Sequence, residues 1–200
     1  MIDPEWALYL ALFAVAATFT PGPNALLLLT VAARFGLRPA VPAALGVAIG
    51  IPSVIVVMGA GLGGVLDAVP RLRVVMHVLA TLYICWLGWQ ILRMGPPGQT
   101  LPDDARPVTL WQAAALQWIN PKVWTMAIGA IGAYGLEDRP IVGALLVGAV
   151  FAVVCVPAVS AWTLFGSALR RWLTSAVRLT VFKVAMGGAL LVSIGLTWVT

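Results

Sequence analysis

Six long apolar runs, separated by short polar stretches, make up most of the chain. Each contains about 20 or more residues, the length that an α-helix needs to cross the hydrocarbon core of a membrane. The longest connection, from Gly95 to Val108, is rich in turn-forming proline and glycine. The pattern therefore predicts an all-α polytopic membrane protein with six transmembrane helices and no room for a soluble domain. The runs cover residues 5–33, 39–66, 73–94, 109–135, 140–166 and 180–199.

The composition supports this prediction and excludes several other classes of protein. Of 200 residues, 62% are hydrophobic and only 10% are charged, whereas a typical soluble domain is about 25% charged. A water-soluble globule, a disordered chain and a disulfide scaffold are therefore excluded. The first run lacks the basic segment that precedes a cleaved signal peptide, so it is predicted to remain as a membrane helix.

The net charge of +5 comes from basic residues that lie singly or in pairs between the apolar runs. This scatter argues against a nucleic-acid surface and favours cytoplasmic loops, which carry an excess of Lys and Arg. With Lys122 set aside because it lies inside a run, the loops on alternate sides carry three and eight basic residues. Both termini share the side with three, so they are predicted to be periplasmic. The three are Arg71, Arg73 and Arg139; the eight are Arg34, Arg38, Arg93, Arg106, Arg170, Arg171, Arg178 and Lys183.

Two of the six runs are interrupted by proline near their middle. The first contains Thr-Pro-Gly-Pro-Asn at residues 20–24, and the fourth contains Asn-Pro-Lys at residues 120–122. Proline removes a backbone donor and clashes with the preceding turn, so a helix kinks or breaks there. The freed backbone groups must face protein or a water-filled cavity, because lipid offers them no hydrogen bond.

The two breaks occupy matching positions in the two halves of the chain. Asn24 and Asn120 are 96 residues apart, and similar offsets separate the second and fifth runs. Residues 1–200 are therefore interpreted as one transporter domain built from two repeats of three helices, at about 1–100 and 101–200. Three is odd, so the second repeat enters the membrane inverted. Matched broken helices in inverted repeats are typical of the substrate sites of secondary transporters.

Lys122 is the one charge well inside a run. A cation at the centre of a bilayer costs about 3 kcal/mol by insertion scales, so it needs a partner or a function. We expect Lys122 to face a polar cavity and to pair with a substrate carboxylate or take part in proton coupling. The alternative is a structural lysine that snorkels to the interface or binds carbonyls freed at the break.

The side chains around both breaks can serve the same cavity. Asn24 and Asn120 are expected to cap the half-helices that follow the breaks, whose N-termini attract anions. Gln117 lies one turn before Asn120 and is expected near the same cavity. The candidate substrate-binding residues are Thr20, Pro21, Gly22, Pro23, Asn24, Gln117, Asn120, Pro121 and Lys122.

No enzyme, cofactor or metal site is predicted. Cys85 and Cys155 lie in apolar runs without further ligands and are expected to be small packing residues. Gly59, Gly61 and Gly64 match G-x-G-x-x-G, but they lie late in a membrane run and not at a strand–turn–helix junction. Gly46 and Gly50 are spaced for close helix packing, and such faces allow a homodimer.

The motifs resemble those of a known family. Residues 20–24 and 120–122 look like the two signature motifs of the lysine-exporter type (LysE/RhtB) amino-acid exporters, and residues 82–89 resemble the third-helix pattern of that family. Residues 80–82 depart from it, with Ala-Thr-Leu where Gly-Ala often precedes the Tyr. The sequence around Asn120 and Lys122 looks closer to the branch that exports cysteine and O-acetylserine.

The resemblance implies secondary-active export of amino acids or close derivatives from the bacterial cytoplasm, across the inner membrane and driven by protons. Transport would follow an alternating-access mechanism with the substrate site near the midplane of the membrane. Two alternatives remain open at the level of the sequence: a non-transporting scaffold or accessory subunit, and an exporter of another small solute or a cation. The scarcity of acidic residues in the runs disfavours a cation, since hard cations prefer carboxylate oxygens.

Overall fold

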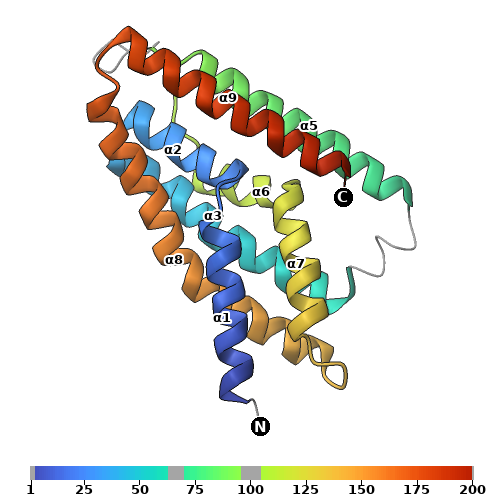
Figure 1. The fold of residues 1–200 in the computed structure, drawn as a ribbon. Coiled ribbons are helices and arrows are strands. Elements are labelled where there is room, and N and C mark those ends of the chain that lie inside the picture. Colours follow the sequence, from blue (N-terminus) through green and yellow to red (C-terminus); the bar gives the residue numbers. More distant parts are fainter. Residues whose placement is uncertain (1–2, 63–69, 96–104, 200) are drawn as a thin grey trace.

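The computed structural model describes residues 3–62, 70–95 and 105–199, and in these ranges every element is a helix (Figure 1). The predicted all-α class is therefore confirmed. Residues 96–104 of the predicted loop, and Gly64, lie outside the described residues. The helices are α1 (Pro4–Phe19), α2 (Pro23–Phe35), α3 (Leu37–Val57), the π-helical η1 (Met58–Leu62), α5 (Pro70–Leu92), α6 (Leu110–Trp118), α7 (Pro121–Tyr134), α8 (Pro140–Trp172) and α9 (Ala176–Val199).

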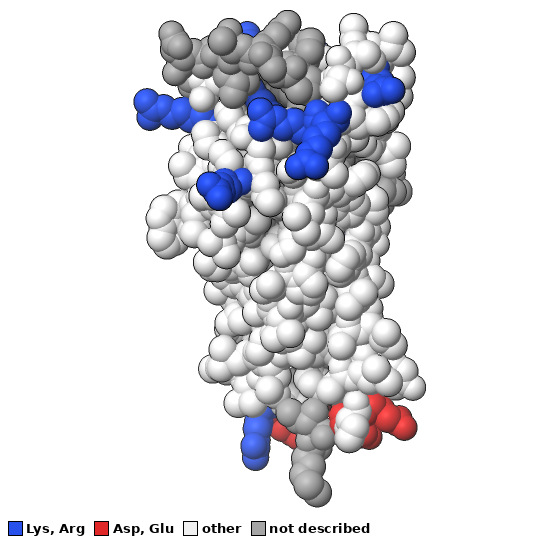
Figure 2. Space-filling view, turned by 90° about the vertical axis from the view of Figure 1, so that its left-hand side faces the viewer, with Lys and Arg blue, Asp and Glu red and all other residues white. Residues whose placement is uncertain are grey.

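Several of these helices have the length and apolar composition of a membrane span. Among the described residues, Leu37–Gly61 and α8 each qualify alone, and α1 with α2 forms a qualifying pair bent by 53°. The shorter helix His77–Leu92 is also apolar. A wide uncharged surface separates the charged ends of the molecule in Figure 2, as a protein surrounded by lipid requires.

The core forms where α3 and α8 pack against each other in the middle of the bundle (Figure 1). α3 also contacts α2, α6 and α7, and α8 contacts α1 and α2. The buried side chains are mostly aliphatic, with Phe151 the largest of those that are fully buried. α5 packs chiefly on α9, and this pair lies along one side of the other helices.

The charges are separated toward the two ends of the molecule. Basic side chains gather near one end in Figure 2 and the acidic ones near the other. Arg34 and Arg38 flank the junction of α2 and α3, and the guanidinium of Arg170 at the end of α8 reaches Gly36 in this junction. Arg139 lies beside Glu137 and Asp138 before α8. The side chain of Arg73 is not among those described.

Several helices extend beyond the predicted runs: α5 begins at Pro70 and α9 at Ala176, and the largest difference is at the end of α8. The fifth run was expected to end at residue 166, but α8 continues to Trp172. Charged residues do not stop a helix, and Arg170 and Arg171 in its last turn favour continuation because their charge complements the negative end of the helix dipole.

The expected small-residue contact is present between α3 and α6. A Cβ atom on Gly46 would lie 2.7 Å from Ala113 Cβ and would collide with the backbone oxygen of Leu110. A Cβ atom on Gly50 would collide with the Gln117 side chain. The two glycines therefore hold α6 close to α3, and α6 leads directly into the second break.

Replacing Gly46 with Ala should destabilise the protein by about 1–3 kcal/mol, because this core has no room for a methyl group. Gly132 in α7 is the matched control, since a Cβ atom there meets nothing within 4 Å. Thermal unfolding in detergent should show a lower midpoint for Gly46→Ala than for Gly132→Ala. Equal midpoints would contradict the packing described for α3 and α6.

Candidate functional site

The first break lies between α1 and α2. α1 ends at Phe19, Thr20 and Gly22 have extended backbones, and α2 begins at Pro23. A residue that precedes proline is pushed out of the helical region, and this applies to Thr20 before Pro21 as well as to Gly22 before Pro23. Proline is well tolerated at the first position of a helix. The sequence therefore ends one helix and starts another within four residues.

The second break lies between α6 and α7. Ile119 ends α6, Asn120 caps α7, and Pro121 is its first residue. The Asn120 side chain accepts a hydrogen bond from the Lys122 amide at 3.1 Å, which confirms Asn120 as a cap. The indole of Trp124 donates to the Trp118 carbonyl at 2.9 Å, so one carbonyl freed by the break has a partner.

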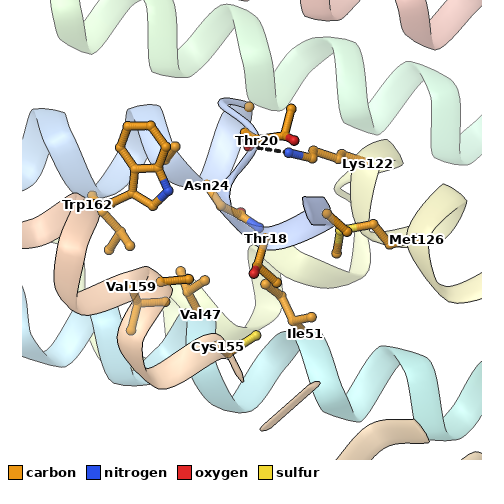
Figure 3. A pocket seen from close by; sticks show the side chains of 15 residues that line it. Thr18, Thr20, Asn24, Val47, Ile51, Lys122, Met126, Cys155, Val159 and Trp162 are labelled. Atoms are coloured by element: carbon orange, nitrogen blue, oxygen red, sulfur yellow. Dashed lines mark hydrogen bonds between the residues drawn. The ribbon is translucent and has the colours of Figure 1, made fainter. Parts of the chain in front are cut away.

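The two breaks face each other and are joined by two hydrogen bonds. Asn120 Nδ2 donates to Asn24 Oδ1 at 2.8 Å, and Lys122 Nζ donates to the Thr20 carbonyl (Figure 3). Residues about 100 positions apart in the chain thus form one polar cluster. It satisfies backbone and amide groups that would otherwise face an apolar interior.

The expectation that Asn24 caps a helix is wrong. The N-cap of α2 is Gly22, which has no side chain to accept a bond, and Asn24 is the second residue of the helix. Pro23 shifts the start of α2 one residue earlier than the asparagine. The Asn24 carboxamide is consequently free to reach across to Asn120.

A small cavity adjoins the cluster (Figure 3). Its volume of about 20 Å³ holds about one water molecule. Polar groups of Thr18, Thr20, Asn24 and Lys122 line one part, and apolar side chains complete the wall. The cavity is therefore amphipathic and, in this conformation, too small for an amino acid.

The predicted residues fall into two groups around this cavity. Thr20, Gly22, Asn24 and Lys122 line it. A Cβ atom on Gly22 would lie 2.8 Å from Lys122 Cδ, so glycine here makes room for the lysine. The others, which do not line the cavity, are Pro21, Pro23, Gln117, Asn120 and Pro121.

Gln117 and Asn120 are fully buried and do not line the cavity. Gln117 Nε2 donates to the Ala113 carbonyl at 2.8 Å, and its Oε1 has no hydrogen-bond partner within the described ranges. Gln117 also packs on Gly50 of α3. Gln117 therefore packs between α6 and α3 beside the break, and its side chain does not form part of the cavity surface.

Other lining residues could not be found from sequence. The apolar wall of the cavity is formed in part by Val47 and Ile51 of α3, Met126 of α7 and Val159 of α8. In the sequence, nothing distinguishes these residues from lipid-facing residues in an apolar run. The cavity is also lined by Ala17, Ala25, Leu28, Cys155, Ala158 and Trp162.

The two cysteines differ in their surroundings. Cys155 is buried and lines the cavity, whereas Cys85 of α5 is exposed. The expected packing role therefore fits Cys155 only. Among the described residues, no group of three or more His, Cys, Asp or Glu side chains could hold a metal ion.

Comparison with protein families identifies the group to which this arrangement belongs. The profile described as LysE type translocator matches residues 15–200, which include both breaks. The chain belongs to this family. The LysE-type chain is accordingly a membrane transporter and not an enzyme, in agreement with the resemblance of its motifs.

Curated relatives of this LysE-type chain are named cysteine/O-acetylserine efflux proteins. The protein of Klebsiella pneumoniae subsp. pneumoniae is 26% identical over 160 residues, which cover 80% of this chain and 81% of the relative. The protein of Escherichia coli strain K12 is 27% identical over 129 residues, which cover 63% of this chain and 64% of the relative. No solved structure matches the chain.

The two roles of Asn120 can be separated by substitution. Serine can also cap a helix but cannot reach Asn24, whereas alanine does neither. We expect Asn120→Ala to lower the free energy of unfolding by about 1–2 kcal/mol more than Asn120→Ser does, because only alanine removes the cap. Asn120→Ser should itself lose about 1 kcal/mol with the interhelical hydrogen bond.

Thermal unfolding in detergent measures these differences. The Asn24→Ala substitution removes the same interhelical hydrogen bond from the side of its acceptor. A double-mutant cycle between positions 24 and 120 should give a coupling of about 0.5–1.5 kcal/mol. Additive effects of the two substitutions, or equal stabilities of Asn120→Ser and Asn120→Ala, would contradict the assigned contacts.

Proposed function

We propose that this protein is a secondary-active exporter of amino acids or close derivatives, with its substrate site in the cavity between the two helix breaks. Membership of a translocator family favours transport over a scaffolding role. The names of the cysteine/O-acetylserine efflux relatives favour a small amino-acid substrate over a cation.

The contact between Lys122 Nζ and the Thr20 carbonyl carries this proposal. A carbonyl is a weaker partner for an ammonium group than a carboxylate is, because bonds between two charged groups are stronger. An amino acid carries both a carboxylate and an ammonium group. Its carboxylate can take Lys122 while its ammonium group takes the freed Thr20 carbonyl. The zwitterion then replaces one internal contact with two.

The rest of the site suits the same kind of ligand. The N-terminus of α7 begins at Pro121 next to Lys122 and adds partial positive charge for a carboxylate. The apolar wall formed by Val47, Ile51 and Met126 would suit a short and weakly polar side chain once the cavity opens. Cysteine and O-acetylserine have side chains of this kind.

Transport requires the cavity to open, because about 20 Å³ does not admit an amino acid. α1, α2 and α7 meet at the breaks, where the helical ladders are already interrupted. We infer alternating access in which these segments move against the packed pair of α3 and α8. Of the described residues that line the cavity, only Lys122 carries an ionisable nitrogen, which supports a proton as the coupling ion.

The proposed membrane arrangement has six spans as two inverted repeats, about 1–100 and 101–200, in a single domain. Each broken pair, α1 with α2 and α6 with α7, would then form one span with its break near the midplane. The contact of Asn24 with Asn120 at a separation of 96 residues supports the pseudosymmetry. The charge distribution supports an inner-membrane protein with periplasmic termini. A homodimer would need a surface other than the one at Gly46 and Gly50, because these glycines pack against α6 within the chain.

Replacing Lys122 with Ala should reduce export at least tenfold, because the substrate carboxylate loses its counter-charge. Lys183 is the matched control, since it lies in α9 and donates to the Leu92 carbonyl. Efflux of cysteine, O-acetylserine, serine, homoserine and lysine from loaded cells measures the effect, normalised to the amount of protein in the membrane. Wild-type export by Lys122→Ala would contradict the proposed site.

Fusions after Thr200 test the orientation. Alkaline phosphatase joined there should be active and green fluorescent protein should be dark, because the C-terminus is expected in the periplasm. Fusions in the loop between α2 and α3, at Gly36, should behave in the opposite way. A fluorescent C-terminal fusion would reverse the proposed topology without affecting the assignment of the cavity.

A further inference from the structure

A second and much larger hollow lies between α5 and the segment that leads into α6. It has a volume of about 1080 Å³ and is open to the outside of the bundle. Among the described residues, none lines both this hollow and the cavity between the breaks. We refer to it as the α5–α6 groove, and the export proposal gives it no role.

One end of the groove is basic. Arg34 of α2, Arg93 after α5 and Arg106 before α6 line it together. Arg34 Nη1 donates to Gln90 Oε1 at 2.9 Å, and the Arg93 guanidinium lies 4.0 Å from the centre of the Trp89 ring. No Asp or Glu of the described part lines the groove. Three arginines from three segments therefore line the same hollow, and guanidinium groups are well suited to bind a phosphate oxyanion.

One wall of the groove is largely apolar and follows α5 away from the basic end, whereas Thr109 and Gln112 add polar groups on the side of α6. Leu79, Leu82 and Trp86 form this wall, and Leu82 is 61% exposed. From Leu79 to Arg93 the helix rises about 21 Å at 1.5 Å per residue. This matches the hydrocarbon depth of one leaflet, about 15 Å, plus part of the headgroup layer.

We propose that the α5–α6 groove binds one anionic phospholipid, with its phosphodiester at the arginines and an acyl chain along α5. Basic pockets between membrane helices at a cytoplasmic face are known to suit acidic headgroups, and Trp89 has the interfacial position that indole prefers. A free amino acid could use the charges but not the apolar wall. The lipid would hold α5 against α2 and α6.

The test uses the full-length protein purified in detergent and mixed with equal amounts of phosphatidylglycerol and phosphatidylcholine of identical chains. Native mass spectrometry counts each bound lipid. We expect the wild type to retain at least fivefold more phosphatidylglycerol, and Arg93→Gln with Arg106→Gln to bring this ratio close to one. Arg139→Gln with Arg171→Gln removes the same charge outside the groove and should keep the preference.

Five results would overturn the proposal. The first four are no preference in the wild type, an unchanged preference in the Arg93 and Arg106 variant, an equal loss in the control variant, and displacement of the lipid by cysteine or O-acetylserine. Glycerol 1-phosphate tests the apolar wall: weak competition supports a lipid, and competition at the lipid's own concentration would reduce the site to a headgroup pocket and overturn the lipid assignment. The readout needs no transport, so it is independent of the proposed function.

Discussion

A helix that breaks inside a membrane frees backbone carbonyls and amides that lipid cannot satisfy, and the arrangement of this protein depends on how those groups find partners. The two breaks supply partners for each other. Asn120 caps α7 and also donates to Asn24, while Lys122 donates to the Thr20 carbonyl of the other break. Neither broken segment could be buried alone without unpaired polar groups. Their pairing holds the start of α2 next to the start of α7 and leaves a polar pocket inside an apolar bundle.

Much of this could be predicted from sequence, because the physical signals were local. Run length and charge scarcity indicate membrane helices, and proline beside Asn24, Asn120 and Lys122 indicates the breaks. Proline alone was not sufficient, since Pro52 and Pro157 lie within continuous helices. The breaks occur where two prolines bracket a glycine or where an asparagine caps the next helix.

The remainder depended on tertiary contacts. Pro23 starts α2 one residue before Asn24, so Asn24 does not cap that helix. The cavity wall depends on the crossing of α3 with α8. Gln117 was predicted beside the cavity, but its side chain turns toward Gly50. Val47, Ile51 and Trp162 carry no local signal that separates a cavity wall from a lipid-facing surface. The sequence therefore indicated most of the polar residues that line the cavity, and the packing of distant helices determined its apolar wall.

If the cavity between the breaks opens to receive an amino acid at Lys122, as we propose, the thiol of Cys155 reports that opening directly. Cys155 is fully buried here and lines the cavity, so a thiol reagent reaches it only when the cavity opens. The experiment uses a Cys85→Ala background and substrates that carry no thiol, such as O-acetylserine or serine. Adding such a substrate should lower the rate at which methanethiosulfonate modifies Cys155. The Lys122→Ala substitution should abolish this protection. A rate that no amino acid changes, or protection that persists without Lys122, would contradict the account.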